Sequence, residues 1–188
     1  MLYGVDTRAH EEIKEMEKEL GADTLFELSR VKLSSQSVTP KILWIKKHCP
    51  DVWKNTRYLL TASGYLTWKM TGKRVQGIYD AISFPGLFDV EKGCWTTRYE
   101  DYLAPVSMLP ELMWNYEIAG HINQQTAEET GLVEGTPVLP GCADAAAEAL
   151  SAGLSQPGDM MLMYGSSTFL YYRLSSCLRL IHFGVTTF

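Results

Sequence analysis

The sequence predicts a folded α/β protein, and three observations support this class. Apolar residues make up 46% of the 188 residues and charged residues 21%, which are ordinary values for a globular protein. Segments with the apolar period of a helix alternate along the chain with short apolar runs typical of strands. Glycine and proline mark many boundaries, and no internal repeat or low-complexity linker is present. The length suits one domain with an appendage.

The first half of the chain is expected to be mainly helical. Apolar spacing predicts a strand over residues 2–5, helices over 7–20, 40–48 and 65–70, the last opened by Ser63, and a strand over 57–61. Asp6 or Thr7 is the expected cap of the first helix. Thr39 is the expected cap of the second, because its hydroxyl precedes Pro40 at the first helical position.

In the second half of the chain, helices and strands are expected to alternate more regularly. The expected elements are a helix near 95–103, a strand over 117–122, a helix over 123–130, a buried strand over 136–143, an Ala-rich helix over 145–152, and strands over 160–164 and 168–174. Asp144 is expected to end the buried strand. Gly131 and Gly153 are expected to close the two helices.

Charge and cysteine content narrow the function classes. The formal net charge is −5 with no dense basic cluster, which argues against a nucleic-acid partner. No apolar stretch approaches the ~20 residues that span a bilayer, and charged residues interrupt any N-terminal signal sequence, so no membrane partner is expected. The four cysteines are widely spaced without a C-x-x-C pair, so we expect no metal site or redox motif and a cytoplasmic setting.

Asp144 is the first candidate functional residue. It lies where a predicted buried strand passes into a helix N-terminus, and open α/β sheets bind ligands at the carboxyl ends of their strands. The helix N-terminus carries roughly +0.5 of an elementary charge, which favours an ionised carboxylate that can accept a proton from a substrate hydroxyl. The alternative is that Asp144 caps the helix through backbone N–H groups. The two roles do not exclude each other.

Two further segments carry candidate binding residues. The run Gly165-Ser166-Ser167-Thr168 joins two predicted strands, and a turn of small residues can present N–H groups and hydroxyls to a phosphate. The alternative is an ordinary hairpin turn. Asp6 and Arg8 either face one cleft or are a helix-capping carboxylate and a surface cation. These alternatives stay open on the residues alone.

Short segments of this sequence, taken in order, match motifs that occur together in one enzyme family. They are Tyr3-Gly4-Val5-Asp6-Thr7-Arg8, similar to W-x-D-x-R; Lys41-Ile42-Leu43-Trp44-Ile45-Lys46, similar to K-L-L-W-L-K; Leu59 to Leu66 followed by Met70-Thr71-Gly72; Tyr79-Asp80-Ala81, similar to S-D-A; Leu87-Phe88-Asp89 ahead of Trp95; Gly135-Thr136-Pro137-Val138; Gly141-Cys142-Ala143-Asp144, similar to G-x-x-D; and Tyr164 to Thr168, similar to a G-T-S loop. Their order and spacing resemble the FGGY family of carbohydrate kinases, which includes xylulokinase, gluconokinase and glycerol kinase.

The resemblance implies a fold and a domain division. FGGY kinases have two ribonuclease-H-like domains, the fold type of actin and hexokinase. The family's D-x-G-T loop near the chain start and its later adenine-packing glycine pair have no counterpart in this sequence. We therefore expect an incomplete version of the fold. Residues 1–154 would be the C-terminal part of the sugar-binding domain and residues 155–188 the start of the nucleotide-binding domain.

The resemblance also implies site residues and ligands. Asp144 would be the general base, and Asp6, Arg8 and Asp144 would contact a small sugar or polyol. Gly165, Ser166, Ser167 and Thr168 would hold phosphate oxygens of the nucleotide. The full-length enzyme would use ATP and Mg²⁺, whereas this chain is expected to bind neither tightly. Ala145 stands where xylulokinases have asparagine, so the motif does not identify the sugar.

The expected function is therefore part of an ATP-dependent carbohydrate kinase that is inactive as the isolated chain. A homodimer is one candidate assembly, because a partial domain exposes apolar surface. The first alternative is a non-catalytic sugar-binding or interaction module with the same fold. The second is a glycoside hydrolase that uses Asp144 with Glu148, for which the sequence offers no supporting partner at a strand end.

Overall fold

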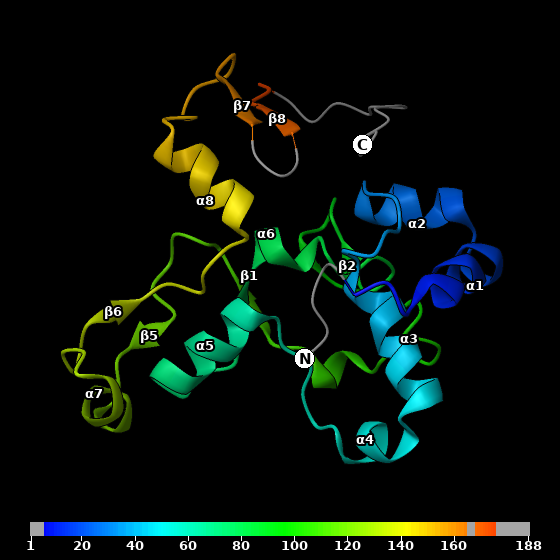
Figure 1. Cartoon of the computed structure of the whole chain (residues 1–188), viewed down its shortest axis with the longest axis horizontal. Coiled ribbons are helices and arrows are strands. Elements are labelled where there is room, and N and C mark those ends of the chain that lie inside the picture. Colours follow the sequence, from blue (N-terminus) through cyan, green and yellow to red (C-terminus); the bar gives the residue numbers. More distant parts are fainter. Residues whose placement is uncertain (1–5, 165–167, 176–188) are drawn as a thin grey trace. The chain divides into compact units, whose positions relative to one another are not determined.

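The chain divides into two compact units, Met1–Cys142 and Ala143–Phe188. The structure is a computed structural model that describes residues 6–164 and 168–175 (Figure 1). The strand predicted at residues 2–5, the predicted turn at 165–167 and residues 177–188, which match none of the family motifs, lie outside the described residues. Within the described ranges, no helix is long and apolar enough to cross a membrane.

Helices supply most of the regular structure of the first unit (Figure 1). They are α1 (His10–Leu20), α2 (Ala22–Ser29), α3 (Val38–His48), α4 (Pro50–Asn55), α5 (Ala62–Thr71), α6 (Ile78–Ala81) and α7 (Gln124–Thr130), with a 3₁₀ turn at Val106–Met108. α3 is central among the N-terminal helices because it packs against both α1 and α4. α5 packs against β1 (Val75–Gly77), β5 (Gly120–His121) and β6 (Pro137–Val138).

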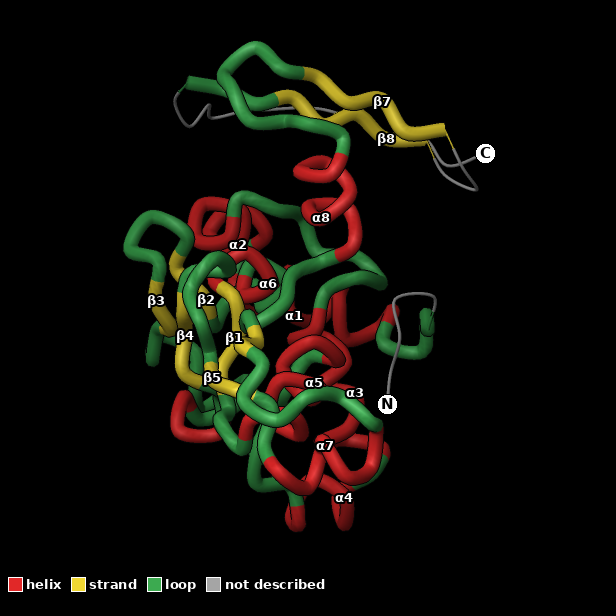
Figure 2. The backbone as a smooth tube through the Cα atoms, turned by 90° about the vertical axis from the view of Figure 1, so that its left-hand side faces the viewer, coloured by secondary structure: helices red, strands yellow, loops and turns green. Residues whose placement is uncertain are grey.

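The strands are short and pair two by two. In the first unit β1 (Val75–Gly77) runs parallel to β4 (Glu111–Met113), and two antiparallel pairs join β2 (Phe88–Asp89) to β3 (Cys94–Trp95) and β5 (Gly120–His121) to β6 (Pro137–Val138). Figure 2 shows β1 and β4 side by side. The second unit holds α8 (Asp144–Ser151) and an antiparallel hairpin of β7 (Met160–Tyr164) and β8 (Thr168–Tyr172). Helices alternate with strands, so the α/β class is confirmed.

The core of the first unit lies between α1, α2, α3 and the irregular segment that follows α6. Its fully or nearly fully buried members are Met16, Leu25, Ile42, Leu43, Ala81, Phe84, Leu87, Phe88, Leu103, Ala104 and Leu109. Trp95 packs edge-on against Phe84 and Phe88, with ring centroids 5.3 and 5.7 Å apart. The indole N–H of Trp95 donates to the Pro110 carbonyl at 2.7 Å, which ties the irregular segment to this aromatic cluster.

Both predicted helix caps are wrong. α1 begins at His10 after Ala9, and no side chain caps it, because the Asp6 carboxylate is already bonded to Arg8. α3 begins one residue before Thr39. The Thr39 hydroxyl is buried and donates to the Pro85 carbonyl at 2.9 Å, far away in the sequence. The Asp6 and Thr39 side chains are each hydrogen-bonded to another group instead of to a helix N–H.

Several predicted helices and strands differ from those in the structure, and others are confirmed. Residues 57–61 form no strand, since the Leu59 N–H donates to the Met108 carbonyl of the 3₁₀ turn instead. The predicted helix near 95–103 is a series of turns, and the strands predicted at 117–122 and 136–143 shrink to β5 and β6. The predictions for α5, α7, β7 and β8 are confirmed to within three residues at each end. α7 ends at Gly131 as expected, and the Asn123 side chain caps its start by accepting from the Thr126 N–H.

Replacing Thr39 with valine is expected to lower the free energy of unfolding by about 1–3 kcal/mol, because the Pro85 carbonyl then loses its donor inside the protein. Urea unfolding followed by tryptophan fluorescence measures this change. Thr130→Val is the matched control, since Thr130 is an exposed residue whose hydroxyl donates, in a part-buried bond, to the Thr126 carbonyl one helical turn back. That control should change the unfolding free energy by less than about 0.5 kcal/mol. Equal losses in both variants would contradict the prediction.

Candidate active site

The structure brings Asp6 and Arg8 together as an ion pair at the start of the described chain. The Arg8 Nε and Nη2 groups donate to both Asp6 carboxylate oxygens at 2.6–3.1 Å, and the Arg8 backbone N–H adds a further bond at 3.1 Å. The side-chain bond from Arg8 is the main reason that the pKa of Asp6 is lowered to about 2. The Arg8 guanidinium also lies 4.4 Å from the centroid of the Trp44 ring. Asp6 is therefore an anion with a fixed orientation at neutral pH.

Asp6 shares a small cavity with Lys41 of α3. The cavity has a volume of about 100 Å³, and Ser34, Ser35 and Ser37 form part of its wall. Burial lowers the pKa of Lys41, and the Asp6 carboxylate opposes that shift. A water molecule takes roughly 30 Å³ of liquid volume, so this cavity suits a few waters rather than a sugar. The predicted substrate contacts of Asp6 and Arg8 stay a prediction.

A larger cavity of about 410 Å³ contains none of the predicted site residues. It lies between α3, α4 and the turn that precedes the 3₁₀ turn, and Lys46 and Trp53 line it. The Lys46 ammonium is hydrogen-bonded within the protein, because it donates to the carbonyls of Tyr102 and Leu103 at 2.8 and 3.2 Å. Burial lowers the pKa of Lys46. The cavity thus lies beside a structural lysine.

A polar network lies where α5, β1 and α6 meet. The Ser63 hydroxyl donates to the Asp80 carboxylate at 3.0 Å and lies 2.9 Å from the Thr61 hydroxyl. The Thr61 hydroxyl in turn lies 3.3 Å from the buried Gln76 amide oxygen and accepts from the Gly64 N–H as the cap of α5. Sequence reasoning missed this network, although Asp80 belongs to the segment that resembles S-D-A.

Asn115 links this region to the segment that precedes Asp144. The Asn115 Nδ2 group donates to the Gly141 carbonyl at 2.6 Å, and its Oδ1 atom accepts from the Tyr79 N–H at 3.1 Å. Asn115 belongs to none of the motifs that the sequence offered, so no signal in the sequence singled it out.

Asp144 is the first residue of α8 in the second unit, and it is exposed. Ala143 occupies the N-cap position without a side-chain cap bond, so the structure does not support the alternative in which Asp144 is the cap. The predicted buried strand before it is also wrong, because β6 ends at Val138 and is only partly buried. One Asp144 carboxylate oxygen accepts from the Ala145 N–H at 2.8 Å. The carboxylate is thus open to solvent at a helix start.

The predicted phosphate-binding run is only partly described. Gly165, Ser166 and Ser167 lie outside the described residues. Thr168 begins β8, is exposed, and pairs with Tyr164 across the hairpin. The hairpin formed by β7 and β8 agrees with the predicted strand pair, and the phosphate contacts stay a prediction.

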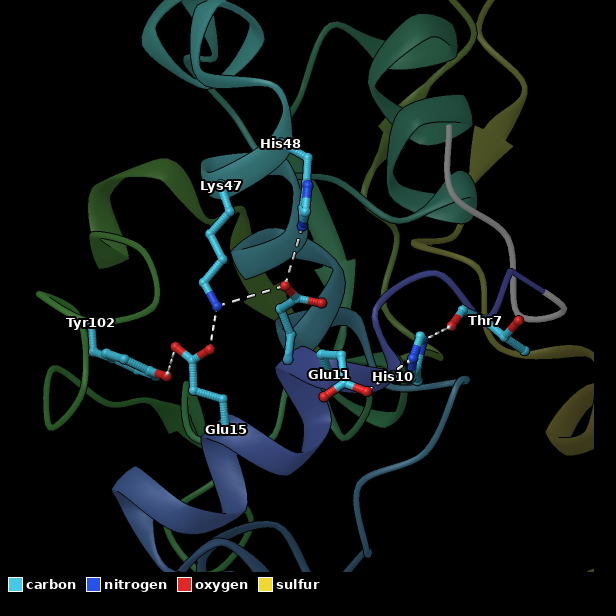
Figure 3. Close-up of polar contacts among 8 residues, drawn as sticks. Thr7, His10, Glu11, Glu15, Lys47, His48 and Tyr102 are labelled. Atoms are coloured by element: carbon cyan, nitrogen blue, oxygen red, sulfur yellow. Dashed lines mark hydrogen bonds and ion pairs between the residues drawn. The ribbon is translucent and has the colours of Figure 1, made fainter.

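A second charged cluster joins α1 to α3 (Figure 3). Glu12 is buried and lies 3.6 Å from the Lys47 ammonium and 3.5 Å from His48 Nε2. Lys47 also pairs with Glu15, which accepts from the Tyr102 hydroxyl at 3.0 Å. Burial and the Glu15 bond raise the pKa of Tyr102, and the Lys47 ammonium lowers the pKa of Glu15. These contacts cross from one helix to the next, so we interpret the cluster as structural.

No metal site appears in the part of the chain that the structure describes. No group of three or more histidine, cysteine, aspartate or glutamate side chains could hold an ion there. Cys49 and Cys94 are free thiols, and the expected cytoplasmic setting stays a prediction.

Replacing Arg8 with glutamine is expected to raise the pKa of Asp6 from about 2 toward its ordinary value of 3.8. Because the folded-state pKa is depressed, the Asp6 pair stabilises the protein above pH 4 and loses this effect as the pH falls toward 2. The variant should therefore show less acid-dependent loss of stability in that window. Carboxyl ¹³C NMR titration of Asp6 measures the pKa, and Lys14→Gln, which removes the partner of Glu11, is the control. An Asp6 titration unmoved by Arg8→Gln would contradict the assignment.

Comparison with known proteins identifies the family. The model of the FGGY family of carbohydrate kinases, N-terminal domain, matches residues 2–151. Xylulose kinase of Bacillus subtilis (strain 168) is 27% identical over 163 residues, which cover 86% of this chain and 32% of that protein. Autoinducer-2 kinase of Yersinia enterocolitica is 30% identical over 173 residues, which cover 86% of this chain and 31% of that protein. The chain thus spans about a third of the length of these relatives.

Solved structures agree with this match. The crystal structure of xylulose kinase from Rhodospirillum rubrum superposes with a TM-score of 0.81 at 29% identity, covering 87% of this chain and 33% of that one. The expected actin/hexokinase-type fold, present in part, is therefore confirmed. Kinases of this family use ATP and Mg²⁺. By its match over residues 2–151, this chain belongs to the FGGY family of carbohydrate kinases.

Proposed function

We propose that this chain forms part of a carbohydrate kinase that transfers the γ-phosphoryl group of ATP to a hydroxyl of a sugar or polyol. Asp144 is the proposed general base. The observation that carries the proposal is the exposed carboxylate at the first residue of α8, at the end of the segment similar to G-x-x-D, inside the part of the chain that matches the family. Phosphoryl transfer depends mainly on positioning and charge stabilisation, with a base near the nucleophile.

The proposed reaction moves one proton and one phosphoryl group. The sugar hydroxyl gives its proton to the Asp144 carboxylate while its oxygen forms a bond to the γ-phosphorus. The bond between that phosphorus and the β,γ-bridging oxygen breaks, so ADP leaves and the sugar phosphate remains. The protonated Asp144 then returns its proton to water. A carboxylate does this only where a hydroxyl can reach it, and the exposure of Asp144 supports that requirement.

Asp6 and Arg8 are the proposed sugar-binding residues. Four bonds hold the Asp6 carboxylate in one orientation, and in the described part of the chain the Arg8 Nη1 group makes no hydrogen bond. A fixed guanidinium with free N–H groups can donate to sugar hydroxyls without further ordering. The name of a relative as a xylulose kinase makes a ketose one substrate to test.

The proposed nucleotide contacts are Gly165 to Thr168. Of these only Thr168 is described, and its exposed position at the start of β8 is compatible with a phosphate contact. No step is assigned to Mg²⁺ on this chain. Because the family's D-x-G-T loop and adenine-packing glycine pair have no counterpart in this sequence, we expect the 188-residue chain alone not to turn over.

A non-catalytic sugar-binding or interaction module is the second candidate. Assay of phosphorylation across a sugar panel, using a full-length enzyme that carries this sequence, separates the two functions. Sugar binding without any phosphorylated product would favour the module.

Replacing Asp144 with asparagine in that full-length enzyme should lower kcat at least about 100-fold, because the amide cannot take the hydroxyl proton. Sugar affinity, measured by calorimetry, should stay within a few fold. Glu148→Gln is the matched control, since Glu148 is exposed one turn further along α8. Near-normal turnover of Asp144→Asn would rule out the base assignment, and sugar release from an aryl glycoside that depends on Glu148 would revive the hydrolase.

Adding ATP and MgCl₂ at millimolar concentration to the 188-residue chain should raise its melting temperature by less than about 1 °C, because ligand stabilisation scales with site occupancy. Differential scanning fluorimetry measures this shift, with MgCl₂ and sodium triphosphate as the ionic control. A rise of several degrees specific to ATP would show that the chain holds a more complete nucleotide site.

A further inference from the structure

The Arg8 guanidinium makes two kinds of contact within the first unit. Its Nε and Nη2 groups donate to the Asp6 carboxylate at 2.6–3.1 Å. Its central carbon also lies over the indole ring of Trp44, 4.4 Å from the ring centroid. A cation over the face of a tryptophan ring is attracted by the electron density of that face. Arg8 is therefore held by a carboxylate and by an aromatic ring together.

The bonds to Asp6 alone do not place Arg8 against the rest of the unit. The two residues are near neighbours in the sequence, and neither belongs to a helix or strand. Bonds between them set their positions relative to each other. Trp44 belongs to α3, which packs against both α1 and α4. Its contact with Arg8 therefore connects the ion pair to the helices of the first unit.

Trp44 is well supported for this purpose. It follows Ile42 and Leu43, core residues of α3 that are 3% and 4% exposed. His48, one turn further along α3, stacks on the Trp44 ring with centroids 4.9 Å apart and an angle of 24° between the planes. His48 Nε2 lies 3.5 Å from the buried Glu12 carboxylate of α1. The indole thus stands on a helix anchored in the core, with a second ring beside it.

The two contacts leave part of the guanidinium available to a ligand. The Arg8 side chain is 56% exposed, and its Nη1 group makes no hydrogen bond to the residues that the structure describes. Ordering a long side chain when a ligand binds costs conformational entropy. A guanidinium that is already held in one orientation avoids most of this cost.

We infer that Trp44 is a positioning residue for sugar binding: its ring holds the Arg8 guanidinium in the orientation in which Nη1 can donate to a sugar hydroxyl. Trp44 acts through Arg8 and touches no reacting atom. This inference rests on the proposed sugar-binding role of Asp6 and Arg8.

The contact is tested first on the 188-residue chain by ¹⁵N relaxation of the Arg8 Nε–Hε group. Trp44→Leu, which removes the ring, should lower the order parameter of this group below about 0.6, the range of flexible groups. Trp44→Phe, which keeps an aromatic face, should keep it close to the parent value. Trp44→Met fills more volume without a ring and serves if Trp44→Leu fails to fold. Arg30, which pairs with Glu91, is the internal reference and should not change. Unchanged order of Arg8 in the Leu and Met variants would overturn the inference.

The consequence for binding is tested in the full-length enzyme that carries this sequence, with the sugar that the panel assay identifies. Trp44→Leu should raise KM about fivefold and leave kcat within about twofold, because a contact that aids binding is lost and the base is not touched. Trp44→Phe should recover most of the loss. Trp53→Leu is the matched control, since the Trp53 ring also lies under a cation, the Lys46 ammonium, with 5.3 Å to the centroid. This control should leave KM within about twofold.

A double variant separates positioning from a general structural role. In the Arg8→Gln background, Trp44→Leu should raise KM by less than a further factor of about two, because no guanidinium remains to be held. An equal fivefold rise in both backgrounds would overturn the inference. If Arg8→Gln raises KM and Trp44→Leu does not, the inference fails and the proposed role of Arg8 survives. If Arg8→Gln leaves KM at the parent value, the proposed role of Arg8 and the inference fail together.

Discussion

Irregular backbone packed against helices must find hydrogen-bond partners, and the first unit depends on side chains to supply them. Between Ala81 and Gly120 regular structure is limited to short strands and a 3₁₀ turn, so the ladder bonds of a sheet satisfy few of its carbonyls. Side chains take over this role: Thr39 donates to Pro85, Lys46 to Tyr102 and Leu103, and Trp95 to Pro110. α3 supplies two of these donors. The helix therefore fixes the irregular segment as well as burying its own apolar face.

This dependence explains which elements the sequence predicted. α7 could be predicted because its start at Asn123 and its end at Gly131 are set by residues within the helix and beside it. The hairpin of β7 and β8 is equally local. Thr39 was predicted to cap α3 because a hydroxyl before proline is a local signal. The Thr39 hydroxyl instead donates to the Pro85 carbonyl, which lies 46 residues further along the chain. No local sequence pattern indicates that these two residues meet.

The candidate site divides in the same way. Asp144, Asp6 and Arg8 could be predicted because each stands in a short segment with a recognisable order of residues. The surroundings of Asp144 could not, since the predicted buried strand proved to be a short β6 followed by a loop. Asn115 could not be predicted either. The Asn115 side chain contacts Gly141 and lies beside Gly77 because three segments that are distant in the sequence pack together. The spacing of residues along the chain does not indicate which loops pack together.

Burial separates the two charged clusters of the first unit by role. Glu12 is 3% exposed, and one of its carboxylate oxygens has no hydrogen-bond partner among the described residues, so this carboxylate carries an unrecovered desolvation cost. Such a group holds helices together but is poorly placed to exchange protons with a substrate. Asp6 and Asp144 are reachable from solvent, one held by Arg8 and the other at the start of α8. A carboxylate that binds or deprotonates a sugar needs access to solvent, and Asp6 and Asp144 meet this requirement where Glu12 does not.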